Sequence, residues 1–137
     1  MLKIKGLLET ALYARDLAVS AAFYERVLNL PVLLRNPRMA AFDAGRGSVL
    51  LVFQQGASTQ DTSGERGTIP GHDARGRLHF ALSIAANDLA GWRARLAQEG
   101  VAIVSEYHWP LGGMSLYFHD PDGHVGELAT PGLWANG

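Results

Sequence analysis

Three side chains able to ligate a metal ion stand at positions that an internal repeat makes equivalent in the two halves of this sequence. Glu9 and His79 each stand near the start of an alternating apolar segment, and Glu127 stands in the last apolar run of the second half, where the first half has Leu51. Two carboxylates and an imidazole that converge would suit a divalent first-row ion and leave coordination positions for water and substrate. We predict one divalent ion per chain (Mn, Fe, Ni or Zn), bound by Glu9, His79 and Glu127.

Each of these residues also has an ordinary structural interpretation. Glu9 would be tolerated as a solvated residue on a half-exposed first strand, and Glu127 could simply face water. His79 could be a buried histidine whose ring bonds a backbone carbonyl. Taken singly the ordinary interpretations are favoured, whereas their occurrence together at repeat-equivalent positions favours a metal site.

The elements that must position these side chains form an internal repeat, whose first copy has a clear periodicity. Alternating residues predict a strand over 6–14, and apolar residues at four-residue spacing after Asp16 predict an amphipathic helix that Asp16 caps. The helix and the three apolar runs that follow it, read as strands, cover residues 17–29, 31–35, 38–43 and 48–54.

The second copy has the same order. A strand over 77–85 precedes a helix that Asn87 or Asp88 caps and that Gly100 ends. Trp92 belongs to the core face of this helix, because it shares the helical spacing of the apolar residues. Three apolar runs, read as strands, follow over residues 101–107, 114–119 and 124–129.

These patterns predict an α+β fold: two tandem βαβββ modules whose curved sheets enclose a shared cavity. We expect a single domain over 1–137, with module one at about 5–55, a loop at 56–76 and module two at about 77–130. The loop is polar and has no periodicity, so it is either a flap near the cavity mouth or a plain linker.

One face of each predicted sheet mixes apolar, aromatic and polar side chains, as ligand pockets do. Tyr117 lies on this face, where it either contacts a substrate or is only a wall residue. The other candidate pocket residues are Tyr13, Leu51, Phe53, Ser83, Tyr107, Trp109 and Ser115.

Composition narrows the possible partners. The chain has 137 residues, a formal net charge of −1 and no cysteine, which excludes disulfides, thiolate metal sites and a thiol nucleophile. There is no basic stripe for nucleic acid, no signal-peptide core and no apolar run of the roughly 20 residues that span a bilayer. We expect a cytoplasmic protein with a small-molecule partner, no nucleic acid and no membrane.

Two segments resemble the vicinal oxygen chelate superfamily of glyoxalases, bleomycin-resistance proteins, fosfomycin-modifying thiol transferases and ring-cleaving dioxygenases. They are residues 10–30 (TALYARDLAVSAAFYERVLNL) and 115–128 (SLYFHDPDGHVGEL). The resemblance implies this same βαβββ repeat and places the family's metal ligands at the positions of Glu9, His79 and Glu127, with glutamate where most metal-dependent members have histidine. It also implies a homodimer.

The resemblance implies subclass differences as well. Leu51 stands where glyoxalase I and the epimerases have a fourth ligand, which argues against both. Tyr117 matches a tyrosine that contacts the substrate in some ring-cleaving and fosfomycin-type members. Ala11 replaces the threonine of the fosfomycin enzymes, and the residues after Glu127 include no Lys or Arg, which argues against that activity.

Three functions remain in competition. The first is a divalent-metal-dependent enzyme, either a lyase or isomerase or a ring-cleaving dioxygenase, acting on a small substrate with two neighbouring oxygens. The second is a metal-free protein that binds drug-like molecules, with an aromatic box made from Phe53, Tyr107, Trp109 and Tyr117. The third is a domain whose site has decayed.

Overall fold

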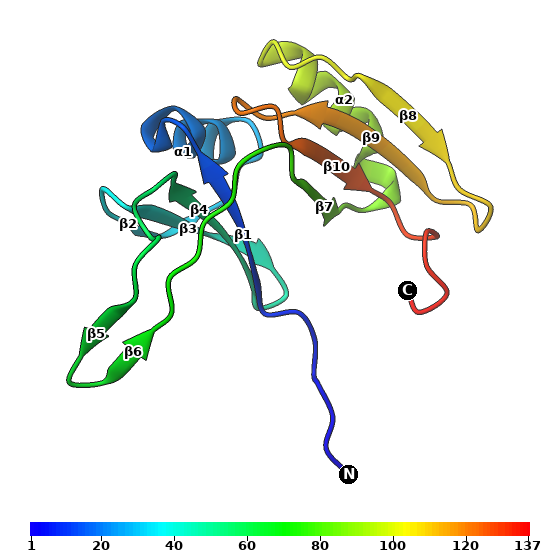
Figure 1. Cartoon of the computed structure of the whole chain (residues 1–137). Helices are drawn as coiled ribbons and strands as arrows, with labels where there is room; N and C mark the ends of the chain where they lie inside the picture. The colour runs from blue at the N-terminus through cyan, green and yellow to red at the C-terminus, as the bar shows by residue number, and fades with distance from the viewer. The chain divides into compact units, whose positions relative to one another are not determined.

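The computed structural model describes all 137 residues and divides into two compact units, Met1–Arg75 and Gly76–Gly137. Each unit contains one βαβββ module, and we call them module one and module two (Figure 1). The predicted α+β fold of two such modules with curved sheets is therefore confirmed. A cavity shared between the modules stays a prediction.

Module one is a four-stranded sheet with one helix. The sheet has the order β1-β4-β3-β2, in which β1 and β4 are parallel and the other pairs are antiparallel. The Asp16 side chain accepts hydrogen bonds from the first backbone amides of the helix, as predicted. The elements are β1 (Glu9–Ala14), α1 (Leu17–Arg26), β2 (Val32–Arg35), β3 (Met39–Gly45) and β4 (Ser48–Gln54).

The core of module one lies between α1 and one face of this sheet. Tyr24 of α1 and Phe42 of β3 are both fully buried, with ring centroids 5.9 Å apart. Leu12, Leu50 and Val52 project to the same face and are almost completely buried. Because side chains alternate along a strand, the residues between them project to the opposite face, away from α1.

The segment between the modules contains a hairpin that the sequence pattern did not predict. Strands β5 (Thr62–Gly64) and β6 (Gly67–Ile69) pair antiparallel, with a side-chain hydrogen bond of 2.9 Å between Ser63 and Thr68. Three-residue polar strands are too short to show an alternating apolar pattern, so the periodicity test could not detect them.

Module two repeats the arrangement in the order β7-β10-β9-β8, with β7 and β10 parallel. Its elements are β7 (His79–Ser83), the short 3₁₀ helix η1 (Ala86–Asp88), α2 (Leu89–Gln98), β8 (Ser105–His108), β9 (Met114–His119) and β10 (Val125–Ala129).

Three details of module two differ from the sequence predictions. Asp88 makes no side-chain cap, because η1 already gives it a helical conformation with φ −95° and ψ −2°. Strand β8 begins only at Ser105, so residues 101–104 are not a strand. Trp92 is half-buried, because the core is filled by residues that include Phe80 and Phe118, with ring centroids 6.2 Å apart, and the fully buried Leu96. None of the helices is long and apolar enough to pass through a bilayer.

Candidate functional site

The strand ladders place the four repeat-equivalent residues at matching positions. Glu9 begins β1, and Leu51 lies two residues beyond the ladder partner of Glu9 in β4. His79 begins β7, and Glu127 lies two residues beyond the ladder partner of His79 in β10. In each module both residues project from the face that is turned away from the helix. The equivalence inferred from the sequence repeat therefore holds in the backbone.

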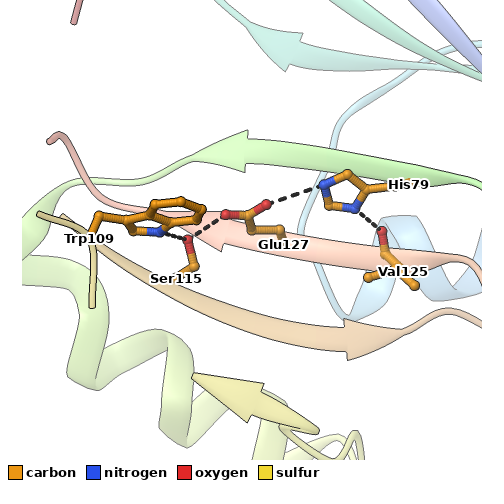
Figure 2. Close-up of polar contacts among 5 residues, drawn as sticks. All are labelled: His79, Trp109, Ser115, Val125 and Glu127. Carbon is orange, nitrogen blue, oxygen red and sulfur yellow. Dashed lines mark hydrogen bonds and ion pairs between the residues drawn. The ribbon is translucent and has the colours of Figure 1, made fainter. Parts of the chain in front are cut away.

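His79 and Glu127 face each other across neighbouring parallel strands, as Figure 2 shows. His79 Nε2 lies 3.3 Å from Glu127 Oε1, and His79 Nδ1 lies 2.9 Å from the carbonyl oxygen of Val125. Since a carbonyl only accepts, Nδ1 carries a proton, and in the neutral ring Nε2 is then an acceptor. A nitrogen lone pair therefore faces a carboxylate oxygen, which is favourable only with a proton or a cation between them.

A chain of hydrogen bonds holds the Glu127 side chain in this orientation. The Ser115 hydroxyl donates to Glu127 Oε2, and the indole Nε1 of Trp109 donates to Ser115 Oγ at 2.8 Å (Figure 2). Glu127 is 4% exposed and Ser115 is fully buried. With Oε2 engaged in this way, Oε1 is the oxygen directed toward His79.

These donor atoms fit a divalent metal ion. An imidazole nitrogen with a free lone pair and a carboxylate oxygen are ligands for which Zn, Mn, Fe and Ni compete. The carbonyl of Val125 fixes the ring tautomer as partners of metal-bound histidines do. The His79 side chain is 53% exposed, so an ion can reach it. Glu9 lies in the other unit, and its part as third ligand stays a prediction.

Tyr117 lies beside this pair on the neighbouring antiparallel strand, directly opposite Glu127 in the ladder. Its ring centroid is 6.4 Å from that of His79. Burial raises the pKa of the Tyr117 phenol, and the negative charge of Glu127 raises it further. The hydroxyl is thus a protonated donor next to the candidate ligands, while its contact with a substrate stays a prediction.

The other predicted pocket residues of module two are more scattered. Tyr107 is 51% exposed and packs against Trp109, with ring centroids 4.6 Å apart. Ser83 is exposed at the end of β7. Trp109 has its single donor committed to Ser115, so it acts on Glu127 through that bond, a role that sequence patterns could not show.

Module one carries a cavity of about 680 Å³ on the sheet face that is turned away from α1. Glu9, Tyr13, Leu51 and Phe53 line it, so module one brings these four predicted site residues together. Arg38, one of three arginines that could approach the cavity on sequence grounds, also lines it, and further lining residues that the sequence did not assign to the pocket include Leu33, Leu34 and His72. Leu33 and Leu34 are leucines of β2 that the structure leaves exposed, and exposed apolar residues of this kind often mark a binding site, but the sequence alone does not show this exposure.

The segment after β4 forms part of the wall of this cavity. His72 Nδ1 lies 2.7 Å from the Tyr13 hydroxyl, and its ring packs edge-on against Phe53 with centroids 4.5 Å apart. The His72 amide donates to the carbonyl of Ser58 at 2.7 Å, which closes the segment on itself. Burial raises the pKa of the Tyr13 hydroxyl, and the charge of Asp73 adds to this. Of the two interpretations of residues 56–76, the structure favours the one beside the cavity.

A second cluster of possible ligands, Asp120, Asp122 and His124, occupies the turn between β9 and β10. Asp120 Oδ1 accepts hydrogen bonds from the amides of Asp122 and His124, at 2.9 and 2.8 Å. His124 Nδ1 accepts from the amide of Leu78 at 3.0 Å. These bonds hold the turn together and attach it to the residue before β7, so the cluster has a structural role.

Comparisons with known proteins agree with this geometry. The family model described as "Glyoxalase/Bleomycin resistance protein/Dioxygenase superfamily" matches residues 6–128. The metallothiol transferase FosB of Bacillus licheniformis is 33% identical over 129 residues, which cover 93% of this chain and 77% of that protein. The crystal structure of lactoylglutathione lyase from Agrobacterium tumefaciens is similar with a TM-score of 0.86 and 30% identity, covering 96% of this chain and 98% of that one. An integron cassette protein from the mobile metagenome of Halifax Harbour sewage outfall shares the fold, with a TM-score of 0.73, 21% identity and coverage of 93% and 99%.

Proposed function

The chain belongs to the glyoxalase/bleomycin resistance protein/dioxygenase superfamily, and on this premise we propose that it is a divalent-metal-dependent enzyme. Its ion is bound by His79 and Glu127 of module two, with Glu9 of module one as the third ligand. Its substrate is a small molecule with two neighbouring oxygens. The observation that carries the proposal is His79 Nε2 lying 3.3 Å from Glu127 Oε1 while His79 Nδ1 is bonded to the carbonyl of Val125.

The residues around this pair have separate roles in the proposal. When bound, the ion supplies Lewis-acid stabilisation of negative charge on the substrate oxygens. Ser115 holds the Glu127 carboxylate, and Val125 fixes the tautomer of His79. Tyr117 keeps its proton at the phenol oxygen and donates a hydrogen bond to a substrate oxygen, because burial beside Glu127 opposes ionisation.

Leu51 shapes the choice of reaction. With a leucine where module two has Glu127, the ion has three protein ligands, so more of its coordination sphere is open to substrate than in a four-ligand site. This favours a lyase, isomerase or ring-cleaving reaction on an oxygen-chelating substrate with an apolar body. The activities named for the two relatives, lactoylglutathione lyase and metallothiol transferase, are comparison reactions for the assay.

The proposal is tested by metal titration of untagged protein that has been stripped with EDTA and dialysed. We expect one Co²⁺ or Mn²⁺ per chain at micromolar affinity, with Co²⁺ giving a visible absorption band. His79→Ala should lose most of this binding, whereas His108→Ala, which removes an exposed histidine of β8, should retain it. Wild-type protein that binds none of Co²⁺, Mn²⁺, Ni²⁺ and Zn²⁺ at micromolar levels would refute the proposal.

A metal-free binding protein is the second candidate, and the module-one cavity favours it. The cavity is lined largely by apolar and aromatic side chains and needs no ion to exist. In this alternative a planar ligand binds equally well before and after EDTA treatment, and no substrate of the assay panel is turned over.

We also propose that the protein forms a homodimer. Each sheet has open edge strands, β1 and β2 in module one and β7 and β8 in module two, and such edges are commonly covered in an assembly. Light scattering that returns the mass of a single chain at working concentration would refute pairing.

A further inference from the structure

We infer that the module-one cavity binds an elongated molecule with an apolar body and a carboxylate at one end, and that Arg38 recognises this carboxylate. The inference deepens the proposed function by naming a substrate class. The inference rests on the proposed function only for the end of the bound molecule that would lie nearest Glu9, the proposed third metal ligand.

The middle of the cavity is apolar. Its walls combine residues of β1, β3 and β4 with the exposed leucines of β2 and with residues of the segment after β4. A volume of about 680 Å³ lies within the usual range of small-molecule sites. The apolar lining residues include Leu33, Leu34, Met39, Leu51, Phe53 and Ile69.

Charged side chains mark the two ends of the cavity. Arg38 lies at the end of the sheet where β1 ends. It directly precedes Met39, which pairs with Phe53, and Phe53 pairs in turn with Tyr13 of β1. Glu9 stands at the start of β1, four residues before Tyr13, which is about 13 Å along a strand. A molecule that reaches both ends is therefore elongated rather than compact.

Arg38 is the only Arg or Lys that lines the cavity, and its charge is not neutralised by a carboxylate. Its Nη2 donates a long hydrogen bond of 3.4 Å to Ser58 Oγ, and it forms no ion pair. The Asn36 side chain accepts from the amides of Arg38 and Met39, at 2.9 and 3.1 Å, which fixes the backbone that carries the guanidinium. A planar guanidinium with unused donors at the edge of an apolar cavity suits a carboxylate.

The test measures binding to metal-free protein, so that its result does not depend on the metal site. The probes are 5-phenylvalerate and its neutral counterpart 5-phenyl-1-pentanol, titrated in EDTA by calorimetry. Wild-type protein should bind the carboxylate about tenfold more tightly than the alcohol, as expected for one charge-assisted contact. Arg38→Gln should abolish this preference, and Arg35→Gln, an exposed arginine of β2 outside the cavity lining, should preserve it.

A further variant locates the probes. Phe53→Ala should lower the affinity for both probes, because the Phe53 ring is part of the apolar wall of the cavity. Equal affinity of wild-type protein for both probes, a preference that survives Arg38→Gln, or binding that Phe53→Ala leaves unchanged would each overturn the inference. If the preference is found while no metal binds, the proposed function fails and the inference about Arg38 stands. If metal binds but the carboxylate is not preferred, the proposed function stands and the inferred substrate class is wrong.

Discussion

The two modules share strand order and register, yet the sheet face that is turned away from the helix is mainly apolar in module one and more polar in module two. Module one places leucine, methionine and aromatic rings there, whereas module two places a histidine, a buried glutamate and a serine. Leu51 and Glu127 are the clearest pair, because they occupy the same ladder position. A repeated backbone can thus carry a polar histidine–glutamate pair in one copy and a largely apolar cavity in the other.

The segments that follow the last strand of each module add a second difference. After β4 the chain turns back, and several residues between Ser58 and His72 line the cavity of module one. After β10, Thr130 bonds the backbone of Met114 and Gly132 packs closely against Gly113, so this segment lies along the start of β9. The cavity of module one is therefore walled by its longer connection as well as by its sheet.

The most direct way to break the contrast is to give module two the leucine of module one. Glu127→Leu should lower metal affinity by at least about a hundredfold, because in the proposal Glu127 is itself a ligand rather than a supporting residue. The fold should persist, since replacing a buried charged group with a packed apolar one is often neutral. Calorimetric metal titration and a thermal unfolding curve measure both effects. Glu106→Gln, which removes an exposed carboxylate paired with Arg93, is the control and should leave metal binding intact.

The helix-facing side of the sheets offers a test of packing. Leu50 pairs with Phe42 in module one, and Gly126 pairs with Phe118 in module two. A Cβ on Gly126 would lie 2.4 Å from the Phe118 ring, which is itself fully buried. Gly126→Ala should therefore cost about 1–3 kcal/mol in the free energy of unfolding, measured by urea denaturation.

Gly91 in α2 is the matched control for Gly126. A Cβ there meets nothing within 4 Å, so Gly91→Ala should stabilise the protein by about 0.5–1 kcal/mol. Equal effects of the two substitutions would show that the Phe118 ring moves aside freely and that the packing contrast between the modules is small.

A smaller effect on metal binding than that of Glu127→Leu should come from the hydroxyl that orients Glu127. Ser115→Ala should lower Co²⁺ affinity about tenfold and alter the cobalt absorption band, because Glu127 loses the donor to Oε2. Met39 occupies the equivalent ladder position in module one, so Met39→Ala should change stability but not the cobalt spectrum. An unchanged spectrum in Ser115→Ala would show that Ser115 does not position the ligand.

Much of the fold could be predicted because apolar periodicity is local. Strand β1, helix α1 and its Asp16 cap follow from alternation, four-residue spacing and a capping side chain, all readable within a short window. The equivalence of Leu51 and Glu127 could also be predicted, because an internal repeat aligns the two halves of the sequence with each other. The hairpin of β5 and β6 could not be predicted from the sequence, because its stability depends on turns and hydrogen bonds rather than on an apolar pattern.

The parts of the site that escaped prediction depend on contacts between distant residues. His72 lines the cavity because the segment after β4 folds back, and nothing near it in sequence indicates this. Trp109 was assigned to an aromatic pocket from its residue type, and only the structure shows its indole donating to Ser115. Likewise, the carbonyl of Val125 that fixes the tautomer of His79 comes from a strand far along the chain.

The hairpin of β5 and β6 has its base at the cavity and its tip in solvent. Thr62 and Ile69 pair at the base and line the cavity, while Glu65 and Arg66 form the exposed turn at the other end. Because the sequence contains no cysteine, Glu65→Cys would create a unique thiol for a fluorophore. Two short strands join a dye at that point to the cavity wall. A change in the emission of the dye would therefore report that a molecule has entered the cavity of module one.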